Sequence, residues 1–212
     1  MRIVKEGWPF ILGCLVASDL FLLGSIFLKR GFWLFVVLAI VFFVLTVFCA
    51  YFFRDPARVI PQDEKLILSP ADGKILEIIE GKDPGFAEPV WILRIFLSVF
   101  EPHLQRSPVK GRVKAIAYKK GKFLDARDPQ APFQNEQNRI EIGGVVITQI
   151  AGLIARRIVC WVKEGQSVQA GEKIGLIRFG SQVDMVFPKN VTLRVKTGDF
   201  VTAGDTVIAE IK

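Results

Sequence analysis

The feature that most constrains this chain is a pair of long apolar segments at its N-terminus. Residues 10–28 are apolar apart from Asp19 and a few small residues, and residues 32–53 carry no charged side chain. Only Lys29-Arg30-Gly31 separates the two segments. Each has about the 20 residues that an α-helix needs to cross the hydrocarbon core of a bilayer. The sequence therefore predicts an N-terminal membrane-anchoring hairpin of two helices over residues 1–54.

Asp19 interrupts the first apolar segment. On insertion scales an acid at the helix centre costs about 2.5–3.5 kcal/mol, while each surrounding Leu, Ile, Phe or Val contributes roughly 0.3–0.6 kcal/mol in favour of insertion. An ion or proton relay is one interpretation, but the segment holds no second ionisable residue to continue such a pathway. The sequence favours a protonated or packed residue within the hairpin.

Basic residues predict the orientation of this hairpin. Four of them flank its open end: Arg2, Lys5, Arg54 and Arg58. Two lie at its turn: Lys29 and Arg30. Positively charged flanks tend to stay in the cytoplasm. We therefore expect both chain ends, and the domain that follows, on the cytoplasmic side of the cell membrane. Because no A-x-A cleavage site follows the charged start, we expect the anchor to be retained.

Residues 55–212 have the composition of a globular domain. The whole chain is 51% hydrophobic with a net charge of +7, three cysteines and one histidine. These values exclude a disordered chain and a disulfide scaffold, and they predict no metal site. Since no block of Lys and Arg resembles a nucleic-acid-binding arm, we expect no nucleic-acid partner. The basic balance suits an anionic membrane surface instead.

Short strand-like segments dominate this domain. Residues 191–196 alternate apolar and polar side chains, as a half-buried strand does. Other strand-like segments lie between clusters of Gly, Pro, Asp and Asn, at residues 75–79, 91–99, 112–118, 145–150, 157–162 and 207–211. Residues 125–138 are polar with two prolines and predict a loop. The expected fold class is mainly β.

One internal repeat lies near the C-terminus. Gly-Gln-Ser-Val-Gln-Ala-Gly-Glu-Lys-Ile at residues 165–174 recurs as Gly-Asp-Phe-Val-Thr-Ala-Gly-Asp-Thr-Val at residues 198–207. Its glycines suit turns with positive φ. The pattern resembles the hairpins of lipoyl and biotinyl carrier domains and implies a barrel-sandwich-like fold. It also supports an alternative function, a membrane-tethered carrier or adaptor without enzymatic activity. A carrier needs a modifiable lysine at a hairpin tip, and the segment between the copies offers only the distant Lys189.

A second repeat singles out Asp72. Ser-Pro-Ala-Asp-Gly-Lys-Ile at residues 69–75 recurs as Ser-Pro-Val-Lys-Gly-Arg-Val at residues 107–113. Asp before Gly is a common turn pair. However, Lys110 stands at the matching place in the second copy. The turn does not demand an acid, which favours a chemical role for Asp72.

An acid, one imidazole and one hydroxyl form the candidate catalytic set. His103 follows an apolar segment, and Ser181 follows Gly180. Taken singly, a lone histidine and a Gly-Ser pair are usually structural. Together with Asp72 they could activate the hydroxyl, with the histidine as base and the aspartate holding its tautomer. The G-x-S-x-G elbow is absent, which argues against a conventional serine hydrolase.

Four motifs, in order, resemble those of the phosphatidylserine decarboxylase family in its short bacterial and archaeal form, which includes archaetidylserine decarboxylase-like proteins. They are Ser-Pro-Ala-Asp-Gly at 69–73, Glu-Pro-His-Leu-Gln-Arg-Ser-Pro at 101–108, Asn-Glu-Gln-Asn at 135–138 and Arg-Phe-Gly-Ser at 178–181. The resemblance covers residues 54–187. Longer members carry a second histidine three residues after the first, where this chain has Arg106.

The resemblance implies a covalent pyruvoyl cofactor made from Ser181. Its Oγ would attack the carbonyl of Gly180, and elimination would then divide the chain into a β chain (1–180) and an α chain (181–212) that remain associated. His103 would be the base and Asp72 its orienting partner. The residue that replaces the second histidine of longer members stays open.

The implied reaction is decarboxylation of a serine head group, phosphatidylserine to phosphatidylethanolamine, through a Schiff base to the pyruvoyl group. The implied partners are a membrane phospholipid, on an ester or an ether backbone, and the bilayer itself; a homo-oligomer stays open. His103 would also donate the proton to the product, and Arg106 would hold the phosphate or carboxylate. A pyruvoyl decarboxylase acting on a soluble amino acid is a further alternative, against which the membrane hairpin argues.

Overall fold

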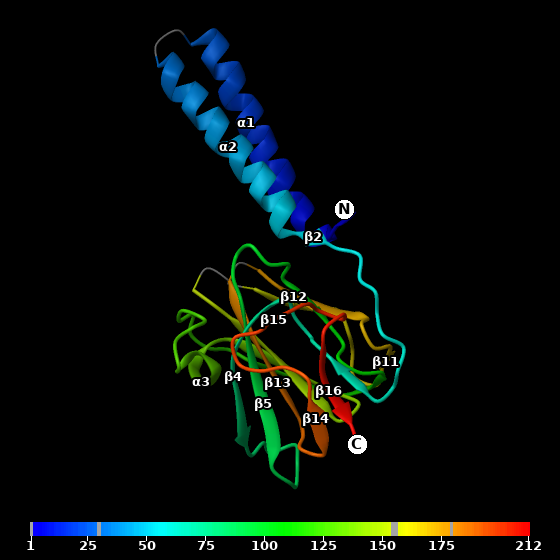
Figure 1. The fold of residues 1–212 in the computed structure, drawn as a ribbon. Coiled ribbons are helices and arrows are strands. Elements are labelled where there is room, and N and C mark those ends of the chain that lie inside the picture. Colours follow the sequence, from blue (N-terminus) through cyan, green and yellow to red (C-terminus); the bar gives the residue numbers. More distant parts are fainter. Residues whose placement is uncertain (1, 29–30, 154–156, 179) are drawn as a thin grey trace. The chain divides into compact units, whose positions relative to one another are not determined.

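The computed structural model describes residues 2–28, 31–153, 157–178 and 180–212 (Figure 1). It divides the chain into two compact units, Met1–Ala57 and Arg58–Lys212. The first unit holds the two long helices, and the second holds nearly all of the strands.

The first unit is a hairpin of two helices. The short strand β1 (Arg2–Ile3) and the 3-10 turn η1 (Lys5–Gly7) lead into α1 (Trp8–Phe27), which is followed by α2 (Phe32–Phe52). Strand β2 (Arg54–Asp55) then pairs antiparallel with β1. Both helices are long and apolar enough to cross a membrane, judged by length and composition.

The two helices pack side by side along their length (Figure 1). The Ser18 hydroxyl donates to the backbone oxygen of Ala39 at 2.9 Å, which joins the helices through a polar contact inside the hairpin. The ring of Phe21 stacks on that of Phe42 with their centroids 5.4 Å apart. The predicted hairpin of apolar helices is confirmed.

Two details of the hairpin bear on the sequence analysis. Asp19 is exposed on α1, so it is not packed against α2 as one interpretation expected. Lys29 and Arg30, which entered the prediction of orientation, lie outside the described residues.

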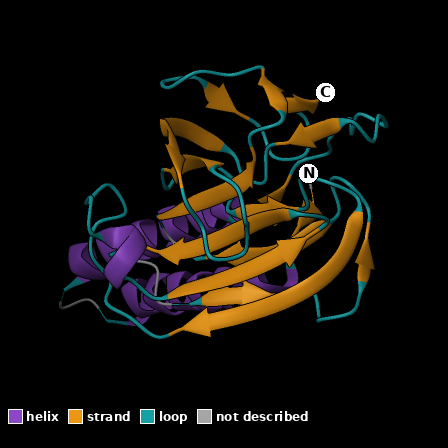
Figure 2. Cartoon of the chain, turned by 90° about the horizontal axis from the view of Figure 1, so that it is seen from below, coloured by secondary structure: helices purple, strands orange, loops and turns teal. Residues whose placement is uncertain are grey.

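The second unit is built on one large antiparallel sheet. Its eight strands follow the order β11-β7-β8-β9-β13-β5-β4-β15. Their bounds are β4 Gly73–Gly81, β5 Val90–Leu97, β7 Gly111–Lys119, β8 Gln137–Ile142, β9 Val145–Ala151, β11 Ser167–Val168, β13 Ser181–Pro188 and β15 Phe200–Val201. Figure 2 shows how the long strands of this sheet curve. The expected mainly-β class is confirmed.

Two three-stranded sheets complete this unit. Their orders are β10-β12-β6 and β14-β16-β3. The bounds are β3 Leu66–Leu68, β6 Leu104–Arg106, β10 Ile158–Cys160, β12 Lys173–Ile177, β14 Val191–Leu193 and β16 Val207–Ile211. The segment expected as a loop at 125–138 contains one turn of helix, α3 (Ala131–Gln134), and the start of β8.

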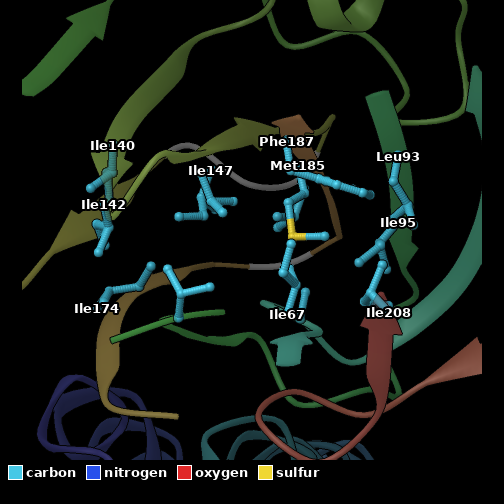
Figure 3. Packing of buried hydrophobic residues seen from close by; sticks show 14 of the residues in the cluster. Ile67, Leu93, Ile95, Ile140, Ile142, Ile147, Ile174, Met185, Phe187 and Ile208 are labelled. Carbon is cyan, nitrogen blue, oxygen red and sulfur yellow. The ribbon is translucent and has the colours of Figure 1, made fainter. Parts of the chain in front are cut away.

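The hydrophobic core lies between the large sheet and the two small sheets. Alternate residues of β13 face it, among them the fully buried Met185 and Phe187. Ile67 of β3, Ile174 of β12 and Ile208 of β16 meet them from the other side (Figure 3). Burial of each such side chain stabilises the fold by roughly 1.5–3 kcal/mol. The packing of the large sheet against the two small sheets is therefore stabilised chiefly by this core.

The two internal repeats pair with each other. Val201 and Val168 of the C-terminal repeat pair with Gly73 and Gly111 of the Ser-Pro repeat, respectively. Backbone hydrogen bonds recur as well. The Gly204 N–H donates to Ser69 O and the Gly171 N–H donates to Ser107 O, both at 2.8 Å. All four repeat glycines have positive φ, from 74° to 94°: Gly165, Gly171, Gly198 and Gly204. The predicted turn geometry is confirmed.

Candidate functional site

Ser181 stands at the first position of β13, the strand in the interior of the large sheet. It pairs with Leu97 of β5 on one side and with Ala151 of β9 on the other. The residue is fully buried, and its Oγ has no hydrogen-bond partner among the residues that the structure describes. A buried hydroxyl without a partner is uncommon and destabilising, so it points to a functional demand at this position.

Gly180 precedes it in a left-handed conformation. Its φ is +66°, which strains any side chain other than glycine. The space around its Cα is open, because an added Cβ would meet only Val99, at 3.9 Å. Conformation rather than crowding therefore requires a glycine before Ser181. Gly152 is constrained for the opposite reason, since a Cβ there would lie 2.4 Å from the carbonyl oxygen of Gly180.

His103 lies against the backbone of Gly180. The imidazole is 1% exposed, and its Nε2 accepts a hydrogen bond from the Gly180 N–H at 3.1 Å. Its Nδ1 lies 2.8 Å from the backbone oxygen of Glu101. Because a carbonyl oxygen only accepts, Nδ1 carries the proton and Nε2 presents a lone pair. The ring is thus a neutral base against the backbone of the residue that precedes Ser181.

Asp72 occupies a different part of the site. Its buried carboxylate accepts a hydrogen bond from Arg58 at 2.5 Å. Burial raises its pKa to about 6, against the opposing effects of Arg58, the Ala203 backbone N–H and the charge of Arg106. This differs from the expectation that Asp72 orients His103, because Nδ1 of that ring bonds a backbone carbonyl.

Arg106 is buried beside Asp72. The residue is 8% exposed, and its Nη1 donates to the backbone oxygen of Gly171 at 3.0 Å. It belongs to β6, three residues after His103, which is about 10 Å along a strand. Arg106 therefore supplies a second cation near the acid. The buried contact favours a structural role for Arg106 over the expected role in holding substrate.

A pocket of about 330 Å³ reaches the backbone of this site. Gly180 lines it together with residues from the end of β5 and from the loop before α3. A larger pocket, of about 540 Å³, lies among residues 86–90 and 188–190. It adjoins the opposite end of β13 from Ser181 and contains none of the candidate residues.

The comparison with known families agrees with this geometry. The model of the phosphatidylserine decarboxylase family matches residues 45–209, which is most of the chain and all four motifs. The chain belongs to the phosphatidylserine decarboxylase family. The decarboxylase is thus assigned to the carboxy-lyases of phospholipid biosynthesis, and its two apolar helices are consistent with membrane association.

Residues of the sequence motifs also make buried hydrogen bonds that stabilise the site. In the third motif, the fully buried Asn135 uses both ends of its amide. Its Oδ1 accepts from Leu124 N at 2.9 Å, and its Nδ2 donates to Leu124 O at 2.9 Å and to Ala151 O at 2.8 Å. Asn135 thereby fastens the loop before α3 to the end of β9, beside Ser181. Phe179, in the fourth motif, lies outside the described residues.

A chain of buried amides behind His103 was missed by sequence reasoning. Gln105 donates to the His103 carbonyl at 2.9 Å, Gln149 donates to Gln105 at 2.8 Å, and Asn138 donates to Gln149 at 2.9 Å. All three amides are at most 3% exposed. The available signal was Gln149 itself, an amide side chain within the mostly apolar β9. Fully satisfied buried networks rigidify a core, so the backbone that carries the decarboxylase's imidazole is held from behind.

Proposed function

We propose that this chain decarboxylates the serine head group of a membrane phospholipid, phosphatidylserine to phosphatidylethanolamine, with a pyruvoyl group that it makes from Ser181. One observation carries the proposal. A buried hydroxyl that has no partner in the described part of the chain follows a left-handed glycine, and the N–H of that glycine donates to the neutral imidazole of His103. That combination supplies a nucleophile, a base and a glycine whose left-handed conformation carries no side-chain penalty.

The first step is attack of the Ser181 Oγ on the carbonyl carbon of Gly180. For this step Nε2 of His103 releases the Gly180 N–H and takes the Oγ proton as the new C–O bond forms, and the same nitrogen returns that proton to the departing Ser181 nitrogen as the C–N bond breaks. The product is an ester in place of the peptide. Loss of the Ser181 Cα proton then expels the carboxylate of Gly180, and water enters as ammonia leaves.

The residues present fit the group that this sequence of steps would leave at position 181. The site is buried, so water is largely excluded from it, and the pocket at Gly180 gives a head group a way in. When formed, the pyruvoyl carbonyl supplies the electron sink for the pair released with carbon dioxide. His103, beside it, is the residue placed to hold the proton that the product needs.

The two chains would stay together after cleavage. Residues 181–212 include β13, which pairs with β5 and β9 of the upstream chain, and β15 and β16, which pair with β4 and β3. Breaking one peptide bond at the first position of β13 leaves the pairs beyond Ser181 in place. The α and β chains are therefore held by the sheet and by the core beneath it.

Asp72 and the anchor keep narrower roles in this proposal. The Glu101 carbonyl orients His103, whereas Asp72 pairs with Arg58 and attracts the charge of Arg106, and so positions β6, the strand that follows His103. The hairpin tethers the enzyme where its substrate lies. The excess of basic residues at its open end favours the cytoplasmic side of the cell membrane for the catalytic unit.

Intact mass spectrometry of the detergent-purified protein tests this function, with Ser181→Ala as the matched variant. We expect wild type to give two chains divided after Gly180, the smaller one ammonia lighter than the 181–212 peptide, and the variant to stay whole. Wild type should also release carbon dioxide from phosphatidylserine in mixed micelles, and the variant should not. An intact wild-type chain without decarboxylase activity would overturn the proposal and favour the carrier.

A further inference from the structure

The pocket at Gly180 has apolar walls and a charged rim. Phe96 and Val99, from the end of β5, line it together with Leu153, which belongs to the loop that follows β9. Asp125 and Arg127, from the loop before α3, also line it. Leu153 is 62% exposed, which gives this opening an apolar outer edge. The pocket thus joins the half-buried Gly180, next to the buried Ser181, with exposed side chains that are charged and apolar.

Arg127 forms a two-pronged ion pair with its neighbour. Its Nε donates to one Asp125 oxygen at 3.0 Å, and its Nη2 donates to the other at 2.7 Å. This is the forked geometry in which an arginine also binds a phosphate. The hydrogen bonds to Arg127 lower the pKa of Asp125 to about 2, so the carboxylate is charged throughout the physiological range.

The pair is open to exchange. The side chains of Arg127 and Asp125 are 67% and 45% exposed, and an ion pair in solvent contributes little to stability. A phosphodiester could replace the carboxylate as the acceptor of the same two N–H groups without leaving a buried charge unpaired. The loop beneath is fixed meanwhile, because Asn135 holds Leu124 and Ala126 is buried.

We infer that this pocket admits the substrate's head group and that Arg127 binds its phosphodiester in exchange for Asp125. The inference rests on the proposed function. In a serine phospholipid the amine must reach position 181, the phosphate lies a few bonds outward, and the acyl chains lie beyond it. The pocket offers a counterpart to each of these parts, namely Gly180 next to the buried Ser181, the charged Arg127 and the exposed Leu153. Arg106, the residue that the sequence suggested, is instead occupied in the interior with Gly171.

Steady-state kinetics of Arg127→Gln test the inference, with two substrates. One is phosphatidylserine in mixed detergent micelles. The other is water-soluble glycerophosphoserine, which keeps the phosphodiester but has no acyl chains. Hydrogen bonds between ionised groups are the strong ones, so we expect KM to rise about tenfold for both substrates, with kcat within about twofold. Chain cleavage should remain complete by mass, because self-processing uses no phosphate.

Two variants serve as controls. Arg127→Lys keeps the charge but loses the fork and should recover part of the lost affinity. Arg194→Gln makes the same change of charge in another exposed ion pair, with Glu210 on the β14–β16 sheet, and should leave both KM values unchanged.

The outcomes separate the inference from the proposed function. If wild type turns over and Arg127→Gln leaves KM unchanged, the head-group site is wrong while the decarboxylase stands. A rise in KM for micelles alone would assign Arg127 to attraction by the lipid surface and also overturn the inference. If wild type decarboxylates neither substrate, the proposed function fails and the inference falls with it.

Discussion

The two Ser-Pro turns, residues 69–75 and 107–113, share a backbone but not an environment. In both copies the serine hydroxyl donates to the backbone carbonyl two residues on, at 2.7 Å from Ser69 and at 2.6 Å from Ser107. In both, the serine carbonyl accepts from a glycine N–H of the other repeat at 2.8 Å. The turn is therefore built twice from the same local chemistry.

The fourth residue separates the copies. Asp72 is buried against Arg58, while Lys110 is exposed and pairs with Glu64 at 2.8 Å. An acid and a base thus occupy equivalent places without changing the turn. The difference teaches that Asp72 is required by its surroundings near the site and not by the backbone that carries it.

Truncating Asp72 and Lys110, the fourth residues of the two turns, should give the largest difference in stability between the copies. Asp72→Ala leaves Arg58, with only 14% of its side chain exposed, as a buried charge without its carboxylate. Breaking one partner of such a pair destabilises by about 3–5 kcal/mol. Denaturant unfolding in detergent measures the loss. The matched Lys110→Ala should shift the unfolding midpoint only slightly, because its pair lies in solvent. Equal losses in the two variants would show that the turn itself needs the fourth side chain.

The two copies should also respond to pH in opposite directions. Burial raises the pKa of Asp72 from 3.8 to about 6, whereas a hydrogen bond from Lys110 lowers the pKa of Glu64. A raised carboxyl pKa stabilises the fold below the unfolded value, and that stabilisation is lost as pH rises toward 6. For Asp72 the change is on the order of 3 kcal/mol. The contribution of Glu64 is present above the unfolded pKa and is lost as pH falls.

Thermal midpoints from about pH 3 to about pH 7 check these signs. Relative to Asp72→Asn, wild type should become less stable as pH rises. Relative to Glu64→Gln, wild type should become less stable as pH falls toward and below 4. Parallel curves for wild type and Asp72→Asn would contradict the environment assigned to Asp72.

Local signals predicted more of this molecule than long-range ones. The apolar hairpin, the mainly-β class and the positive-φ glycines follow from segment length, alternation and residue type, and the structure confirms them. The partners of the site residues required contacts across the chain. Arg58 counted in the sequence only as a flank of the membrane anchor, yet it binds Asp72. Likewise, nothing near His103 in the sequence revealed that Gln149, which is distant along the chain, supports its backbone through Gln105.

The smallest difference in stability is expected between the two copies of the C-terminal repeat, residues 165–174 and 198–207, at positions with similar surroundings. Gly165 and Gly198 open the two copies with φ of 82° and 94°. A Cβ at Gly198 would meet nothing within 4 Å, and one at Gly165 would meet only the end of the Arg112 side chain, at 3.3 Å. Alanine at either position should therefore cost only the strain of a left-handed residue, about 1–2 kcal/mol. Unfolding of Gly165→Ala and Gly198→Ala should show equal losses. A clear inequality would mean that the repeats differ in their backbone as well as in their surroundings, and the contrast between Asp72 and Lys110 could then no longer be assigned to environment alone.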